Sequence, residues 1–116
     1  MHELSLVEGV IDTVRASAIE NNIHKVKKVK LVVGKLSMAL PESLKFAFEV
    51  LCQDELFQGA VLEIEERVIR CRCDGCGHEY DVNDNYSFEC PRCTEGRVEI
   101  VSGRELYIDY YEGEDT

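Results

Sequence analysis

Apolar residues recur at every third or fourth position in two segments of the chain. This spacing predicts helices, because an α-helix completes one turn every 3.6 residues and so gathers such residues on one face. We expect the first helix from about residue 4 to residue 20, and the second from Pro41, where proline suits the first helical turn. The apolar faces consist of Leu4, Val7, Ile11, Val14 and Ala18 in the first helix and of Leu44, Ala47, Phe48 and Leu51 in the second.

Alternating apolar and polar residues predict strands in three other segments. Successive side chains of a strand point to opposite faces, so alternation indicates a strand that is covered mainly on one face. We expect the last of these strands, residues 105–111, to return and pair with residues 61–69. The residues that share a face are Val29, Leu31 and Val33 in the first strand, which Gly34 ends, Leu62, Ile64 and Val68 in the second, and Leu106, Ile108 and Tyr110 in the last.

Two Cys-x-x-Cys pairs lie between the last two of these strands. Cys73-Asp74-Gly75-Cys76 and Cys90-Pro91-Arg92-Cys93 have the separation typical of a zinc ribbon, in which each pair supplies two thiolates of a tetrahedron. With four protein ligands, Zn²⁺ is expected to be structural. It would stabilise a segment that has too few apolar residues to fold by core burial alone. A strand of the ribbon is expected at residues 97–101.

Two further cysteines remain. Cys71 could compete as a ligand, but four residues separate it from Cys76, which is longer than a compact knuckle turn. Cys52 follows an apolar helical run and is expected to be a small core residue. Six cysteines could also form three disulfides. The paired spacing and the lack of a recognisable signal peptide favour metal thiolates in a reducing cytosol.

Length and charge limit the fold and the partners. A chain of 116 residues supports one core and one metal-stapled lobe. The prediction is an α+β fold, with a three-stranded sheet and two helices in residues 1–70 and 104–116 and an inserted zinc ribbon in residues 71–103. No stretch is long and apolar enough to span a membrane. The net charge of −10 argues against nucleic acid as a partner, because phosphate binding depends on Lys and Arg.

The chain begins Met1-His2-Glu3. A free α-amine at Met1, the backbone nitrogen of His2 and an imidazole nitrogen of His2 can close consecutive five- and six-membered chelate rings. That geometry suits a square-planar ion, Ni(II) or Cu(II), rather than zinc. A bulky second residue such as His2 generally prevents removal of the initiator methionine. Taken alone, a histidine at a chain end is more often an ordinary solvated residue.

The opening Met1-His2-Glu3-Leu4-Ser5, the Val33-Gly34 strand end, the two cysteine pairs and the final strand together resemble the HypA/HybF family. This family comprises nickel-incorporation proteins of [NiFe]-hydrogenase maturation, and the resemblance covers nearly the whole chain. It implies that Met1 and His2 bind Ni²⁺ as transferred cargo and that Glu3 supports this site. It further implies that structural Zn²⁺ is held by Cys73, Cys76, Cys90 and Cys93.

The resemblance also implies partners and a location. The protein would be a cytoplasmic nickel metallochaperone and not an enzyme. It would work with the nickel GTPase of hydrogenase maturation, a HypB-like protein, and deliver Ni(II) to the hydrogenase large subunit. A homodimer is left open as the oligomeric state, and neither nucleic acid nor a membrane is expected as a partner.

One departure and two alternatives qualify this interpretation. Some members of the family carry histidines near both knuckles, whereas here His78 keeps its position and Thr94 replaces the histidine after Cys93. An exchange of zinc ligands with acidity is therefore not expected. One alternative function is a zinc-ribbon adaptor in transcription or protein assembly. The other is an enzyme with Cys71 or Cys52 as nucleophile, which would need a positioned base that no recognisable motif supplies.

Overall fold

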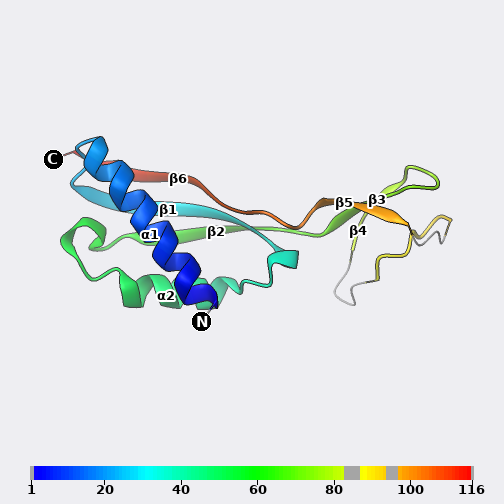
Figure 1. Cartoon of the computed structure of the whole chain (residues 1–116), viewed down its shortest axis with the longest axis horizontal. Helices are drawn as coiled ribbons and strands as arrows, with labels where there is room; N and C mark the ends of the chain where they lie inside the picture. The colour runs from blue at the N-terminus through cyan, green and yellow to red at the C-terminus, as the bar shows by residue number, and fades with distance from the viewer. Residues whose placement is uncertain (1, 83–86, 94–96, 116) are drawn as a thin grey trace. The chain divides into compact units, whose positions relative to one another are not determined.

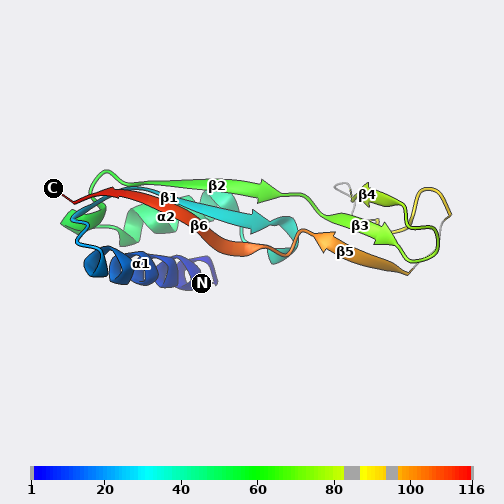
Figure 2. The same ribbon diagram turned by 90° about the horizontal axis from the view of Figure 1, so that it is seen from above.

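The computed structural model describes residues 2–82, 87–93 and 97–115, the first of them by its backbone alone. This part of the chain contains two α-helices, α1 (His2–Glu20) and α2 (Pro41–Leu51), and two three-stranded sheets (Figures 1 and 2). The strand orders are β2-β1-β6 and β4-β3-β5. The predicted α+β class is confirmed. The strands are β1 (Lys25–Gly34), β2 (Val61–Arg67), β3 (Arg70–Cys73), β4 (Glu79–Asp81), β5 (Val98–Ser102) and β6 (Leu106–Glu114).

The chain divides into two compact units. The helical unit consists of Met1–Val32, Ala39–Glu65 and Tyr107–Thr116, and the ribbon unit consists of Val33–Met38 and Glu66–Leu106. In the described part of the chain, neither helix is long and apolar enough to cross a membrane.

The two helices of the helical unit lie on the same face of the β2-β1-β6 sheet (Figure 2). Their predicted apolar faces are largely buried, with Val7, Ile11 and Val14 of α1 and Leu44 and Phe48 of α2 all at most 4% exposed. α2 begins at Pro41 as predicted, and α1 ends at the predicted Glu20 but already begins at His2.

The predicted partner of the last strand is wrong. We expected β6 to pair with β2, but β1 lies between them as the central strand. The physical reason is burial: β1 ends in an unbroken buried run, Leu31, Val32 and Val33, and a central strand has both edges covered. On the open face, Lys30 of β1 accordingly reaches Glu65 of β2 at 3.2 Å and Asp109 of β6 at 3.8 Å.

The predicted strand over residues 61–69 ends two residues early. β2 stops at Arg67, Val68 and Ile69 belong to no strand, and a separate strand, β3, begins at Arg70. Val68, expected on the covered face, is 46% exposed, whereas Ile69 is 1% exposed and belongs to the core of the ribbon unit. The buried face changes because the chain leaves one core and enters another at this point.

The ribbon unit is built around the short sheet β4-β3-β5, in which β3 is antiparallel to both neighbours. One face of this sheet packs into a small core of its own. The buried members of this core are Ile69, Cys71, Cys73, Tyr80, Val82 and Cys90. The sheet thus brings the first cysteine of each Cys-x-x-Cys pair into a buried environment.

Candidate metal centre

Four cysteine sulfur atoms converge at the end of the ribbon sheet. The Sγ atoms of Cys73, Cys76, Cys90 and Cys93 all lie within 4.8 Å of one another. The distance is 3.2 Å between Cys73 and Cys93 and 3.7 Å between Cys76 and Cys90. In tetrahedral zinc with Zn–S bonds of about 2.3 Å, the sulfur atoms are roughly 3.8 Å apart. The cluster is therefore compatible with a metal such as zinc, and the predicted zinc-ribbon signature corresponds to a real convergence of thiols.

Each cysteine pair forms a tight turn that directs backbone N–H groups at sulfur. Gly75 donates to Cys73 Sγ at 3.3 Å, and Arg92 donates to Cys90 Sγ at 3.4 Å. In both pairs the donor lies two residues after the first cysteine. The first turn closes with a hydrogen bond from the Gly77 N–H to the Cys73 carbonyl at 2.9 Å. Gly77 has a φ of 75°, which glycine adopts without strain.

The environment of Cys90 favours its thiolate. Burial of the thiol opposes ionisation, but hydrogen bonds from the Cys93 and Arg92 backbone and from the neighbouring thiols of Cys76 and Cys73 outweigh it. The pKa of Cys90 is consequently lowered from 9.0 to about 7. The thiolate is the form that ligates metal, so this environment is compatible with metal binding at Cys90.

The two cysteines of each pair differ in exposure. Cys73 and Cys90 are buried, whereas Cys76 and Cys93 are exposed. The ribbon core therefore fixes the first sulfur of each pair by packing. The second cysteine of each pair is less enclosed by this core.

The remaining cysteines lie outside this cluster. Cys71 is fully buried in β3, and burial raises its pKa. Cys52, expected in the core, is only half-buried, and burial followed by the charge of Asp54 raises its pKa to about 11. Raised thiol pKa values are the opposite of what a cysteine nucleophile requires.

The predicted nickel ligands are only partly described. Met1 lies outside the described residues, as does the side chain of His2. The backbone of His2 begins α1, and Glu3 follows in the first helical turn. The first N–H groups of a helix have no carbonyl partner within it. The N–H groups of His2 and Glu3 are therefore not used by the helix itself.

The sequence did not predict the surroundings of His78 or the ion pairs on the ribbon sheet. His78 is half-buried and stacks on Tyr80, with ring centroids 5.9 Å apart. Thr94 lies outside the described residues. The ribbon sheet also carries a set of charged pairs on its exposed face, for which the only signal in the sequence is the spacing Arg70-x-Arg72 and Glu79-x-Asp81.

The fold and the cluster define a class of protein: a small α+β protein with a four-cysteine metal ribbon. Residues 1–113 match the family described as hydrogenase/urease nickel incorporation, metallochaperone, HypA. Hydrogenase maturation factor HypA from Moorella thermoacetica is 46% identical over 114 residues, which are 98% of this chain and 100% of that protein. The factor of the same name from Chlorobaculum parvum is 43% identical over 108 residues, 93% of this chain and 95% of that protein.

Solved structures agree with this match. The solution structure of a HypA protein has a TM-score of 0.72 and 26% identity, and covers 100% of this chain and 98% of that chain. The solution structure of the Ni metallochaperone HypA from Helicobacter pylori shares the fold, with a TM-score of 0.65, 24% identity and 98% coverage of both chains. The chain belongs to the HypA family of nickel metallochaperones of hydrogenase maturation, and the resemblance noted in the sequence is confirmed.

Proposed function

We propose that this protein carries Ni(II) at its N-terminus and delivers it, together with a HypB-like GTPase, to the large subunit of a [NiFe]-hydrogenase. The observation that carries the proposal is the family match over residues 1–113. The proposed ligands are the amine of Met1 and the backbone and imidazole nitrogens of His2. These nitrogen donors suit square-planar Ni(II).

The position of these residues at the start of α1 supports this ligand set. A backbone amide nitrogen must lose its proton to bind nickel, which makes the affinity depend on pH. At the first residues of a helix this proton takes part in no helical hydrogen bond, so none is broken. The positive end of the helix dipole also favours the negative charge that remains on the nitrogen. Glu3, in the first turn of α1, is proposed to supply its backbone nitrogen or to orient His2.

We further propose that the four clustered cysteines hold a structural Zn²⁺. The approach of their sulfur atoms to within 4.8 Å of one another supports this assignment. When bound, zinc would supply a crosslink between the two knuckles with no position open for catalysis. Residues 71–103 are proposed to be the zinc-ribbon domain, and residues 1–70 with 104–116 the nickel-binding lobe.

The proposed action is transfer without turnover. The raised pKa values of Cys52 and Cys71 support it, because neither thiol is activated as a nucleophile. We propose that the protein acts in the cytoplasm and keep a homodimer as the oligomeric state to be tested.

The test is a Ni(II) titration of zinc-loaded protein with an unextended N-terminus, followed by visible absorption. Three altered forms accompany it: His2→Ala, a form with two residues added before Met1, and His24→Ala as a matched control, because His24 is an exposed histidine elsewhere in the chain. A weak d–d band of low-spin, square-planar nickel should be present in the wild type and in His24→Ala and lost in the other two. Equal nickel binding by all four forms would contradict the proposed site.

A further inference from the structure

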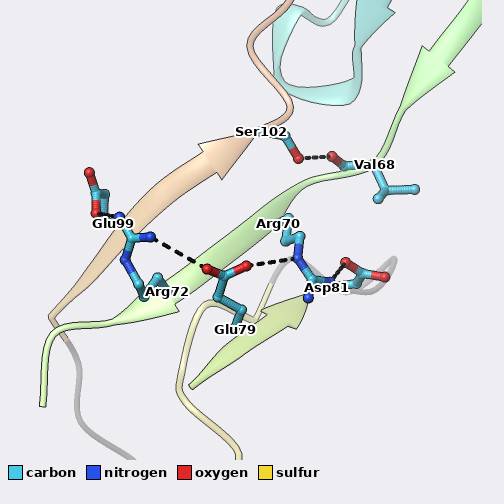
Figure 3. A network of polar contacts seen from close by, with 7 residues as sticks. All are labelled: Val68, Arg70, Arg72, Glu79, Asp81, Glu99 and Ser102. Carbon is cyan, nitrogen blue, oxygen red and sulfur yellow. Dashed lines mark hydrogen bonds and ion pairs between the residues drawn. The ribbon is translucent and has the colours of Figure 1, made fainter. Parts of the chain in front are cut away.

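Arg72 lies in a ladder of charged side chains on the exposed face of the ribbon sheet (Figure 3). Its Nη2 donates to Glu99 Oε1, and its Nη1 donates to Glu79 Oε2 at 3.4 Å. The other carboxylate oxygen of Glu79 accepts a hydrogen bond from Arg70 Nε at 3.3 Å. Arg70 Nη1 then donates to Asp81 Oδ1 at 2.7 Å. These five residues, which we call the charge ladder, cross all three strands.

The two arginines of the charge ladder differ in what they connect. Arg72 of β3 lies directly opposite Glu79 of β4 and directly opposite Glu99 of β5. Arg70 contacts Glu79 and Asp81, which are both on β4. Among the contacts of the ladder, those of Arg72 are therefore the ones that join β4 to β5.

These two outer strands are the ones that leave the two cysteine pairs. Glu79 follows Cys76 by three residues, and Glu99 follows Cys93 by six. The residue after Arg72 is the candidate ligand Cys73. Beyond the strand pairing, backbone hydrogen bonds join this end of β3 to the residues just before β4 and β5, from the Cys73 N–H to the His78 carbonyl at 2.9 Å and from the Asp74 N–H to the Arg97 carbonyl at 3.0 Å. Successive side chains of a strand point to opposite faces, so Arg72 lies on the face of β3 opposite to Cys73.

The four candidate ligands differ in exposure, which bears on the role of the contacts that Arg72 makes with β4 and β5. Cys73 and Cys90 are held by burial in the ribbon core, but Cys76 and Cys93 are exposed. The core therefore packs less closely around the two exposed cysteines, and each of them is followed in the sequence by an outer strand of the sheet. The Arg72 guanidinium binds one carboxylate on each of these strands, Glu79 on β4 and Glu99 on β5.

We propose that Arg72 is a positioning residue for the four-cysteine site, which sets the spacing of the two cysteine pairs by holding their exit strands together. The inference rests on the proposed binding of zinc at these cysteines. Arginine suits the role because its planar guanidinium directs donors to two carboxylates at once, whereas the ammonium of lysine is a single point of charge.

The expected effect is moderate, since the side chains of Arg72 and Glu79 are 42% and 41% exposed and that of Glu99 is 58% exposed. The loss of two such ion pairs corresponds to a change in metal affinity of about three- to tenfold. In 1 M salt the screening length falls to about 3 Å, so most of this change should disappear.

The experiment measures zinc affinity of the whole protein by competition with a chromophoric chelator, for the wild type, Arg72→Gln, Arg72→Lys and Arg70→Gln. Arg70→Gln is the matched control, because Arg70 has the same side-chain exposure of 42% and two carboxylate partners on a single strand. We expect Arg72→Gln to bind zinc about three- to tenfold more weakly and Arg70→Gln to stay within about twofold of the wild type. Arg72→Lys should restore only part of the loss. The absorption of bound Co(II) should broaden in Arg72→Gln alone.

The outcomes separate this inference from the proposed zinc site. If the wild type binds no zinc, both are wrong. If the wild type binds zinc and the two glutamine variants lose affinity equally, Arg72 contributes only to sheet stability and the inference is overturned. Unchanged affinity in Arg72→Gln would overturn it as well. If Arg72→Gln does not fold, Glu99→Gln removes the ion pair to β5 alone and should also weaken zinc binding, by less than the loss of both ion pairs.

Discussion

Gly34 at the end of β1 lies directly against Gly103 in the segment between β5 and β6. A Cβ atom on Gly34 would be 2.1 Å from the Gly103 carbonyl oxygen, which is far inside van der Waals contact. The Leu36 N–H donates to the same oxygen at 2.8 Å, and the Gly34 N–H donates to the Glu105 carbonyl at 2.7 Å. Within the ribbon unit, these contacts leave no room for a side chain at position 34.

Gly34→Ala should therefore destabilise the protein. The added methyl group would meet backbone atoms that cannot rotate away, so we expect a loss of about 1–3 kcal/mol in the free energy of unfolding. Gly9→Ala is the matched control, because a Cβ at Gly9 in α1 has nothing within 4 Å. Gly9→Ala should raise the free energy of unfolding by about 0.5–1 kcal/mol. Denaturant unfolding of both variants checks this, and equal midpoints would contradict the close packing of Gly34.

The ligand assignment predicts different results for Cys76→Ala and Cys71→Ala. Cys76 is exposed and belongs to the four-sulfur cluster, so its loss should weaken zinc binding by at least about a hundredfold, as even loss of an outer-shell partner can do. Cys71 is buried and lies outside the cluster, so its replacement should keep one zinc per chain and lower stability by about 1 kcal/mol. Zinc content after dialysis distinguishes the two. Zinc loss in Cys71→Ala with zinc retained in Cys76→Ala would reverse the assignment.

Thiol alkylation tests the proposal that the protein is not a cysteine enzyme. A pKa of about 11 for Cys52, against 9.0 for an unshifted thiol, lowers its thiolate fraction at pH 7 about a hundredfold. With zinc bound, iodoacetamide should modify Cys52 and Cys71 more slowly than a free thiol, as mass spectrometry of peptides would show. A rate well above that of a free thiol at either residue would favour the enzyme alternative.

The ion pair between Lys27 of β1 and Glu114 of β6, at 2.8 Å, predicts a pH-dependent contribution to stability. The hydrogen bond and charge of Lys27 lower the pKa of Glu114. The stabilising effect of the Glu114 carboxylate is therefore fully present above the pKa that Glu114 has in the unfolded chain. It is lost as the pH falls through the lower pKa that Glu114 has in the folded protein. Glu114→Gln should be slightly less stable than the wild type at pH 7, and the difference should vanish in acid. Glu112→Gln is the control on the same strand, and an equal effect there would contradict a specific pair.

The sequence predicted the type of each secondary-structure element better than it predicted the pairing of the strands. The apolar spacing in α1 and α2 identified residues such as Val7 and Leu44 that the structure buries, because helix periodicity is a local property. Strand order is not local. The alternation in residues 61–69 and 105–111 correctly indicated strands, but Val68, Leu106 and Tyr110, expected on covered faces, are 46%, 40% and 38% exposed. It also did not show that β1 would lie between the two strands.

The same distinction applies to the metal centre. The Cys-x-x-Cys spacing predicted the cluster because each pair forms one local turn, and the structure brings all four sulfur atoms together. The charge ladder could not be predicted, because the contacts of Arg72 with Glu79 and Glu99 depend on the register of three strands. Val68 was misplaced for a related reason, since alternation cannot show where a chain passes from one core to another.

We propose that nickel binds at the N-terminus while zinc occupies the cysteine cluster. Native mass spectrometry of protein loaded with both metals, with and without two residues added before Met1, is the decisive measurement. We expect one zinc and one nickel per chain in the unextended protein, and one zinc with no nickel in the extended form. Nickel retained by the extended form, or nickel gained only as zinc is lost, would contradict it.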